Sequence, residues 1–539
     1  MAQRTKVGKS QHRFGQVPRA DIPRSTFDLS HGVKTTFDAD YLVPMGVFDV
    51  IPGDSWNCKT TIVARLATPL HPLMDSLYID TFYFFVPYRI LWDNFERFMG
   101  AQDDPGDSID FTIPVIEGAQ TINVGDIADY MGIPIGLAGD DVSVSALPFR
   151  AFRKIWNDWF RDENLQDSLD EVTNNGPDNA SASDYDEVPY KRAKKHDYFT
   201  SSLPWPQKGD SVDLPLGTRA DVVGIGLNVT DTGSAAGTIT TRQTGGPPTV
   251  DMDNTWVSGD PQLLFQAEVG NTSYPDIYAD LTDATASTIN ELRLAFQTQR
   301  LLERDARSGT RYVETLKAHW GVTFPDYTAQ RPVYLGGGSQ RVGITPVPQT
   351  TQPTSSTAGN AKGALAGFGY SVGEHSFTKS FVEHGVIIAL ANGRGDITYS
   401  QGIDRYWNKS TRYDFYYPVL SGIGEQSILN REIWADGSAN DDLVFGYTGR
   451  YNEYRFQNSK LTGLMRPDAA STLASWNLSE DFGTLPTLGS TFIESNTGTP
   501  LDRAIAVPSE PHFIADIWHD IKAARPLPLY GVPGGIDHF

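Results

Sequence analysis

The stretch LYIDTFYFFV, residues 77–86, is dense in aromatic and β-branched side chains and is followed by Pro87. Such side chains pack well on a pleated surface, so the stretch predicts a β-strand that is buried on at least one face. Similar apolar runs at 386–391 and 412–420 predict further strands. The three runs place β-structure at the centre of the fold.

The overall composition points the same way. Among 539 residues there are 50 Gly, 34 Pro and 11% aromatic residues, a mixture rich in turn formers and strand formers. We therefore expect an all-β fold with long loops and a few short helices. One helix is predicted near 149–163, where aromatic side chains recur at helical spacing after Pro148, and a second between 288 and 309.

Charge is distributed unevenly along the chain. The whole chain has a formal net charge of -22, yet its first twenty residues carry cations and no acid. These cations are Arg4, Lys6, Lys9, Arg13 and Arg19. Residues 1–24 show no apolar period, which predicts a flexible basic arm. Such an arm on an acidic body suits a subunit that holds nucleic acid on one side and faces water on the other.

A second basic cluster lies in the first half of the chain. It consists of Lys191, Arg192, Lys194, Lys195 and His196. The rings of Tyr198, Phe199 and Trp205 follow it, and such interleaving is typical of grooves that bind single-stranded nucleic acid. We predict nucleic-acid contacts for this cluster and for the arm. A solvated loop beside core aromatic residues is an equally open interpretation of the cluster.

The domain organisation follows from changes in composition. Residues 218–285 hold nine acidic residues against two basic ones, which predicts a large acidic insertion into the main fold. The body on either side of the insertion then spans 25–217 and 286–523. The Pro-rich segment 524–539 suits neither a long helix nor a central strand, so we expect an extended C-terminal arm.

Partial matches to motifs of catalysis and cofactor binding are incomplete in this sequence. The tripeptide at 8–10, Gly-Lys-Ser, lacks the earlier glycine of a phosphate-binding loop, and the glycines at 422 and 424 lack the third glycine of a dinucleotide fingerprint. The ten histidines are scattered and Cys58 is the single cysteine, so we expect neither a zinc site nor a disulfide framework. The expectation is a protein without catalytic residues, cofactor or metal.

Signals for secretion and membrane insertion are not evident in the sequence. The first residues lack the apolar core of a signal peptide, and no stretch reaches the roughly 18 to 20 apolar residues of a membrane span. Together with the single cysteine, this predicts a protein made in a reducing cytoplasm without membrane insertion.

Several long strings have no generic structural role. Near the start stand QVPRADIPRSTFDLSHGVKTTFDADYLVP (16–44) and LATPLHPLMDSLYIDTFYFFVPYRILWDNFERF (66–98). In the middle stand LPFRAFRKIWNDWFRDENLQ (147–166) and KRAKKHDYFTSSLPWPQKG (191–209), and near the end AVPSEPHFI (506–514). With these strings the chain resembles, over nearly its whole length, the major capsid protein of gokushoviruses, small single-stranded DNA phages of the Microviridae.

The resemblance implies a single eight-stranded antiparallel jelly roll with long inter-strand insertions and no enzymatic activity. It further implies a T=1 icosahedral shell of identical subunits around circular single-stranded DNA. In this family a variable insertion builds a protrusion at the threefold axes that is thought to meet the host cell, and residues 218–285 match it by position and composition. The implied location is the virion, assembled in the cytoplasm of a host bacterium.

The same resemblance implies a set of partners. They are further copies of the chain, the single-stranded DNA genome, a host cell-surface receptor, a small basic DNA-binding protein, a pilot protein and an internal scaffolding protein.

Two other classes of protein share parts of this composition. A secreted β-sandwich carbohydrase or lectin would also be aromatic, Gly-rich and acidic, but the missing signal peptide and the cationic arm disfavour it. A cytoplasmic single-strand-binding protein could use the cluster at 191–205, although such proteins seldom carry so large an acidic scaffold. Size-exclusion chromatography separates a shell from a monomer and from a small oligomer.

Overall fold

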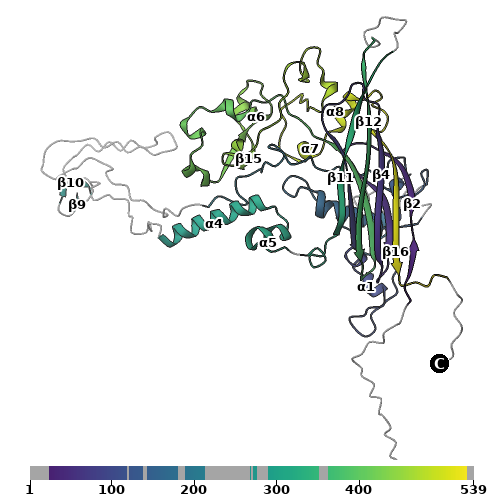
Figure 1. Cartoon of the computed structure of the whole chain (residues 1–539). Helices are drawn as coiled ribbons and strands as arrows, with labels where there is room; N and C mark the ends of the chain where they lie inside the picture. The colour runs from purple at the N-terminus through teal and green to yellow at the C-terminus, as the bar shows by residue number, and fades with distance from the viewer. Residues whose placement is uncertain are drawn as a thin grey trace, which may run out of the picture. The chain divides into compact units, whose positions relative to one another are not determined.

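The computed structural model of the chain describes residues 23–117, 121–137, 143–179, 188–212, 267–268, 271–275, 289–323, 325–350 and 362–530 (Figure 1). The chain divides into two units. The first joins Met1–Pro206 to Ser308–Phe539, and the second is Gln207–Arg307.

One antiparallel sheet dominates the first unit (Figure 1). Its strands follow the order β1-β16-β4-β12-β11-β5-β13-β3, and β2 also pairs with β16. The strands are β1 (Ser25–Asp28), β2 (His31–Phe37), β3 (Leu42–Val50), β4 (Ser55–Leu66), β5 (Leu77–Pro87), β11 (Val333–Pro348), β12 (Leu365–Ser380), β13 (Gly385–Gly395) and β16 (Phe513–Arg525). All except the four-residue β1 are seven residues or longer.

The sheet curls until strands from its two ends meet. The ring of Phe48 in β3, the last strand in the order, lies 5.4 Å from the ring of His519 in β16, the second strand. β11 turns the corner, because its residues up to Val342 pair with β5 whereas those from Gly343 onward pair with β12. One apolar core fills the space between the two halves of the sheet. The expected all-β jelly-roll architecture with eight long strands is thereby confirmed.

The strand predicted at 77–86 is confirmed as β5, and it is buried on both faces. Ile79 and Tyr83 belong to the core between the sheet halves, whereas Phe84 belongs to a second apolar cluster on the opposite face. β13, which contains the predicted run 386–391, is divided between the same two clusters. Side chains alternate between the faces of a strand, so both strands need a packing partner on each side.

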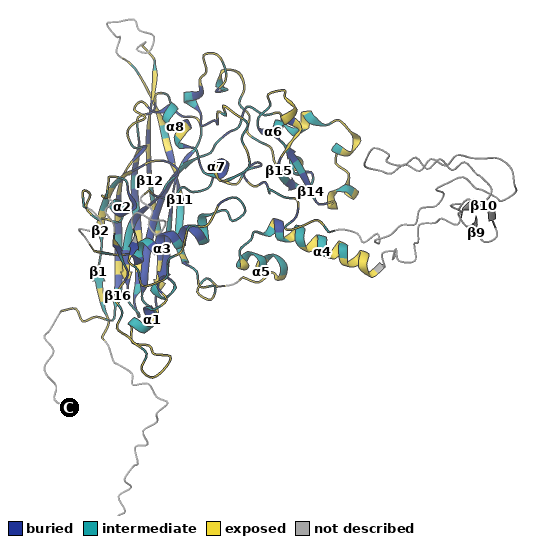
Figure 2. Ribbon diagram, turned by 180° about the vertical axis from the view of Figure 1, so that it is seen from behind, coloured by how far each residue is buried: buried dark blue, intermediate teal, exposed yellow. Residues whose placement is uncertain are grey.

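Short helices supply the partner for the outer face of β5 and β13. They are η1 (Tyr88–Ile90), α1 (Phe95–Phe98), α2 (Ile127–Tyr130), α3 (Leu147–Ile155) and the π-helical turn η2 (Trp156–Phe160). α3 and η2 together form the helix predicted near 149–163, and Phe152 and Trp156 are buried against the outer face of the sheet. In Figure 2 much of α3 and of the neighbouring strands is dark blue, the colour of buried residues.

The long connections of the first unit hold further small elements. They are β6 (Val115–Glu117), β7 (Val144–Ser145), β8 (Asp178–Asn179), α5 (Tyr312–Trp320), η4 (Arg405–Asn408), η5 (Arg412–Asp414), η6 (Pro418–Gly422), β14 (Glu425–Leu429), α6 (Asn430–Ile433), η7 (Ala439–Asp442), β15 (Val444–Gly449), η8 (Asn452–Tyr454), η9 (Gly463–Met465), η10 (Ala474–Trp476), α7 (Ser490–Ile493) and α8 (Gly498–Ala504). Within the described ranges, no helix combines the length and apolar character that a membrane span requires.

The second unit contains β9 (Ala267–Glu268), which pairs with β10 (Asn271–Pro275), and most of α4 (Ile289–Ser308). α4 is the helix predicted between 288 and 309. Most of the insertion predicted at 218–285 lies outside the described residues. Residues 1–22 of the predicted basic arm and residues 531–539 of the predicted C-terminal arm lie outside them as well.

The strand predicted at 412–420 is wrong. The segment forms the 3₁₀ turns η5 and η6, and several of its rings are exposed. The carboxylate of Asp414 accepts hydrogen bonds from the backbone N–H groups of Ser410 (3.0 Å) and Thr411 (2.7 Å). A local side-chain acceptor of this kind stabilises a turn in place of a strand, and Pro418 then starts the second turn.

His519 joins the two ends of the curled sheet from within the core. Its Nε2 lies 3.0 Å from the carbonyl oxygen of Met45, and its Nδ1 lies 2.9 Å from the hydroxyl oxygen of Thr60. A carbonyl oxygen can only accept, so Nε2 carries the proton and Nδ1 accepts from Thr60. Burial lowers the pKa of His519 from 6.5 to about 4, although the bond to Met45 opposes this shift and the nearby His31 adds to it.

We predict that this histidine makes the fold sensitive to acid. Between pH 6.5 and 4 the unfolded chain protonates His519 more readily than the folded chain does. The contribution of His519 to the free energy of unfolding is therefore complete above pH 6.5. It falls by about 3 kcal/mol as the pH drops to 4. Urea unfolding at several pH values should show a steeper loss of stability in the native chain than in His519→Gln. Equal slopes would contradict the prediction.

Candidate nucleic-acid interface

The segment that carries the second basic cluster is held in an extended conformation. The backbone N–H of Arg192 donates to the carbonyl of Asp40 (3.0 Å), and that of Lys194 donates to the carbonyl of Ile493 (2.8 Å). Successive side chains of an extended segment point in opposite directions. The segment therefore sends its cations to different surroundings.

Arg192 crosses to the outer face of the sheet and binds a buried carboxylate. Its Nη1 lies 2.5 Å from Oδ2 of Asp80 in β5, and Nε of Arg394 in β13 lies 2.9 Å from the same oxygen. Asn392, opposite Asp80 in the strand register, lies 3.4 Å from the guanidinium of Arg192. Burial lowers the pKa of Arg192, and the positive charge of Arg394 adds to this effect while Asp80 opposes it. Two guanidinium groups thus share one carboxylate, which leaves an excess of positive charge.

Aromatic rings surround these cations. The guanidinium of Arg192 lies 4.8 Å from the ring centroid of Phe82 in β5 and 5.9 Å from that of Phe160 in η2. Phe84, Trp159 and the exposed ring of Tyr334 complete the aromatic wall of a cavity of about 500 Å³. The cationic wall consists of Arg192, Lys194, Lys195, His196 and Arg394. We call this space the ring-cation cavity.

Lys194 and Lys195 differ in their availability. The ammonium of Lys194 is buried 2.7 Å from a carboxylate oxygen of Glu480 and 4.6 Å from the ring centroid of Phe492. Lys195 is mostly exposed and forms a loose pair of 3.4 Å with Asp396. A surface pair of this kind is worth little in solution. Lys195 can therefore exchange its partner for a phosphate, whereas Lys194 stays paired with Glu480 in the interior.

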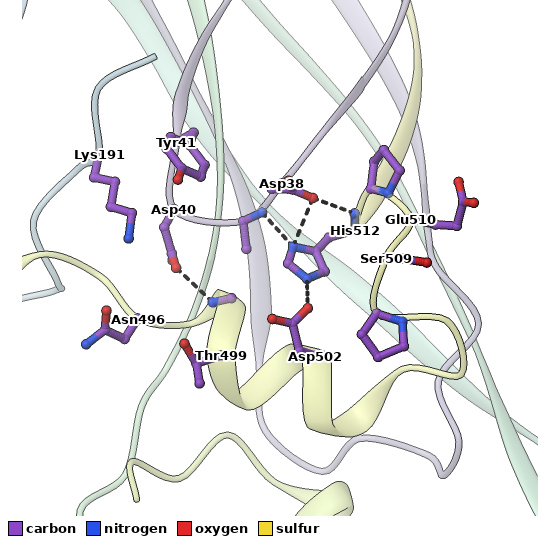
Figure 3. Close-up of a pocket in the computed structure, with 14 residues that line it drawn as sticks. Asp38, Asp40, Tyr41, Lys191, Asn496, Thr499, Asp502, Ser509, Glu510 and His512 are labelled. Carbon is purple, nitrogen blue, oxygen red and sulfur yellow. Dashed lines mark hydrogen bonds and ion pairs between the residues drawn. The ribbon is translucent and has the colours of Figure 1, made fainter. Parts of the chain in front are cut away.

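Lys191 lines a different cavity, of about 320 Å³, which Figure 3 shows. Its ammonium lies 5.6 Å from the ring centroid of Tyr41, and the carboxylates of Asp38, Asp40 and Asp502 line the same space. The structure thus separates Lys191 from the ring-cation cavity. An acidic lining disfavours phosphate, so the surroundings of Lys191 suit a nucleic-acid contact less well than those of the ring-cation cavity.

The acidic cavity is held together by hydrogen bonds within the chain (Figure 3). His512 accepts the backbone N–H of Ala39 at Nδ1 (3.0 Å), and its Nε2 lies 2.9 Å from Oδ1 of Asp502. Asp40 accepts the backbone N–H of Gly498 (2.8 Å), and burial raises the pKa of this aspartate. Across the described residues, no group of three or more His, Cys, Asp and Glu side chains could hold a metal ion. These acids therefore have a structural task.

Two of the rings that the sequence associates with the basic cluster lie outside the ring-cation cavity. Tyr198 and Phe199 are buried in a separate apolar cluster with Ile428 and Ile433. The hydroxyl of Tyr198 donates to Glu432 at 3.0 Å.

Sequence reasoning missed Phe82 and Arg394, which line the ring-cation cavity, and Asp80, whose carboxylate binds Arg192 and Arg394. One signal was present. A carboxylate in the apolar run at 77–86 must find a cation once the strand is buried. The five cations of the arm, Arg4, Lys6, Lys9, Arg13 and Arg19, lie outside the described residues.

A curled antiparallel jelly roll with long loops is a fold found in the coat proteins of viral shells, and also in lectin domains and cupins. Comparison with known families distinguishes between these classes. The family described as Capsid protein (F protein) matches residues 15–535, and the chain belongs to this family.

The chain is similar to three capsid proteins named VP1. The protein of Bdellovibrio phage phiMH2K is 43% identical, covering 98% of this chain and 99% of its own. Those of Chlamydia phage 1 and Spiroplasma virus 4 are 39% and 33% identical, with coverage of 97% and 98% of this chain and 98% of each relative. The resemblance to gokushovirus capsid proteins is confirmed. The chain is a structural protein of a phage virion and not an enzyme.

The shared carboxylate of the ring-cation cavity gives a stability prediction. Asp80→Asn leaves Arg192 and Arg394 without a counter-charge, and we expect it to lower the free energy of unfolding by about 3 kcal/mol. Asp396→Asn, which removes only the exposed partner of Lys195, should lower it by less than about 1 kcal/mol. Urea denaturation of the unassembled chain at pH 7 compares the two variants. Equal losses would show that the two guanidinium groups do not depend on Asp80.

Proposed function

We propose that this capsid protein tiles into a T=1 icosahedral shell that encloses circular single-stranded DNA, and that it assembles in the cytoplasm of a host bacterium. The ring-cation cavity is the observation that carries the DNA part of the proposal. Its cations occur in a chain of net charge -22, where an anionic ligand would otherwise be repelled.

The chemistry of the cavity suits one nucleotide of a single strand. Lys195 and the surplus charge of Arg192 and Arg394 can attract a phosphate, and the ring of Tyr334, which is 41% exposed, offers a face to a base. Every base has a π-face, so such a site accepts any sequence. A shell that packages a whole genome needs contacts of this kind.

The basic arm is the second proposed contact with DNA. It leaves the body at a fixed point, because the guanidinium of Arg24 donates to the hydroxyl of Ser55 (3.1 Å) and to the carbonyl of Ala524 (3.3 Å). We propose that the five cations before this anchor contact phosphates of the single-stranded DNA. Each phosphate contact lowers the slope of log affinity against log salt concentration by roughly 0.7.

We predict that two variants weaken DNA binding while the body stays folded. Removing residues 1–22 keeps Arg24 and should reduce the salt slope by roughly 0.7 for each lost phosphate contact. Lys195→Glu should weaken binding of the unassembled chain to a single-stranded oligonucleotide and lower the ratio of absorbance at 260 to 280 nm in particles. Lys379→Glu changes an exposed lysine on β12 and serves as the control. If both variants kept the native salt slope of DNA binding and the native DNA content of particles, the proposed DNA contacts would be refuted.

We further propose that the inserted unit meets the host cell. Residues 207–307 form a unit of their own, and 218–285 within it are strongly acidic. An insertion outside the main sheet can vary without loss of the core, which suits contact with a receptor. The small basic DNA-binding protein, the pilot protein and the internal scaffolding protein remain proposed partners. Co-purification with intact particles tests each of them.

A blocking experiment tests attachment. An antibody fragment against 218–285 should reduce adsorption of particles to host cells by tenfold or more, because it covers the proposed receptor contact. A fragment of the same size against the segment around the exposed Val382 is the control. Unchanged adsorption with a saturated insertion would exclude the attachment role.

A further inference from the structure

The loops beside β14 and β15 expose an unusual number of aromatic rings. The rings belong to Tyr406, Trp407, Tyr413, Phe415, Tyr416, Tyr417, Tyr454 and Phe456, each at least 42% exposed. Two aliphatic neighbours, Val419 and Ile423, are 89% and 62% exposed. Yellow, exposed stretches also gather beside α6 in Figure 2. We call these ten side chains the aromatic surface.

The aromatic surface is held in place by contacts with neighbouring side chains. The ammonium of Lys409 lies 4.3 Å from the ring centroid of Tyr454 and 5.0 Å from that of Phe415. Arg450 donates to the carbonyl of Tyr413 (3.2 Å), and the rings of Tyr416 and Tyr451 lie 5.3 Å apart. Such a preformed surface loses little conformational freedom when a partner binds.

The area of the aromatic surface matches one side of a stable protein interface. Aromatic side chains bury roughly 150–250 Å² each when covered. Eight rings that are about half exposed therefore present on the order of 800 Å², which is what one partner buries in an interface of standard size. Tyr, Trp, Phe and Arg are also the residue types that are enriched at interface centres.

The cations of this region favour a protein partner over nucleic acid. Arg405 is paired with Glu432 (2.9 Å), Lys460 is paired with Asp404, and Lys409 is held over rings. These three charges have partners within the chain. Val419 and Ile423 are aliphatic and cannot stack on a base, whereas they suit the apolar centre of a protein contact.

Charge also decides how two copies can meet. Residues 404–417 and 449–460 together hold six Lys and Arg against three Asp and Glu, whereas the whole chain holds 44 against 66. Contact of the aromatic surface with its own copy across a twofold axis would bring like charges together. Contact with a different, acidic face of the next copy brings opposite charges together, and such head-to-tail contacts form a ring when the rotation between copies closes.

We propose that the aromatic surface binds an acidic face of the neighbouring subunit around a rotation axis of the shell. The proposal rests on the assembly of this capsid protein into a shell, and it is independent of the proposed DNA contacts. Trp407 and Val419 lie at its most exposed points, so their replacement tests the contact without disturbing the fold of the chain.

The experiment compares two variants with two matched controls in the full chain. Trp407→Ala and Val419→Asp should each raise the protein concentration at half-assembly by about tenfold or more, measured by sedimentation of particles. Trp320→Ala in α5 and Val382→Asp in the β12–β13 turn change side chains that are 69% and 87% exposed elsewhere. These controls should stay within about twofold of the native chain. Thermal melting of the unassembled variants should match that of the native chain.

Three outcomes would overturn the proposal. Native assembly of both variants would show that no subunit covers the surface. An equal loss of assembly in the two control variants would show that the effect is not specific to the aromatic surface. Normal assembly with reduced DNA content would make the surface a contact with the genome. Failure of the proposed DNA packaging would give a different result. The native chain would then form particles without DNA at its usual concentration, and Trp407→Ala would still impair assembly.

Discussion

Burial of β5 and β13 on both faces is the constraint on which the rest of this structure depends. Each strand needs two apolar partners, which are the opposite half of the curled sheet and the layer of short helices. The helical layer ends with η2, whose Trp159 and Phe160 contact the rings of Tyr334 and Phe82. These four rings line the ring-cation cavity, which therefore lies where the end of the helical layer meets the strands.

Burial of β5 and β13 also determines which charged groups lie beside the ring-cation cavity. A carboxylate on the buried face of a strand is costly unless a cation binds it, and Asp80 recruits two. One guanidinium comes from the neighbouring strand and the other from a distant extended segment, so the ion cluster also ties that segment to the sheet. Local stability and an excess of positive charge therefore have a single origin in this chain.

The sequence predicted those features that depend on local pattern. The apolar runs identified β5 and β13, and aromatic spacing identified α3, because burial of a face imposes a period on the residues. The run at 412–420 has the composition of a strand, but Asp414 captures two backbone N–H groups and turns the chain. The basic cluster is evident in the sequence, but the rings beside Arg192 belong to Phe82 and Phe160, and its carboxylate partner Asp80 lies 112 positions away. Residue order marks Asp80 as a carboxylate that needs a cation, but it does not identify that cation.

The pairing of β1 with β16 has a further consequence. Ser25 lies opposite Arg525, so the chain enters and leaves the jelly roll side by side. A short linker could join these points, and new termini could be opened in an exposed loop without breaking the sheet. Circularly permuted subunits of this protein are accordingly a realistic engineering target. A peptide joined directly before Ser25 and one joined directly after Arg525 would start from the same end of the sheet.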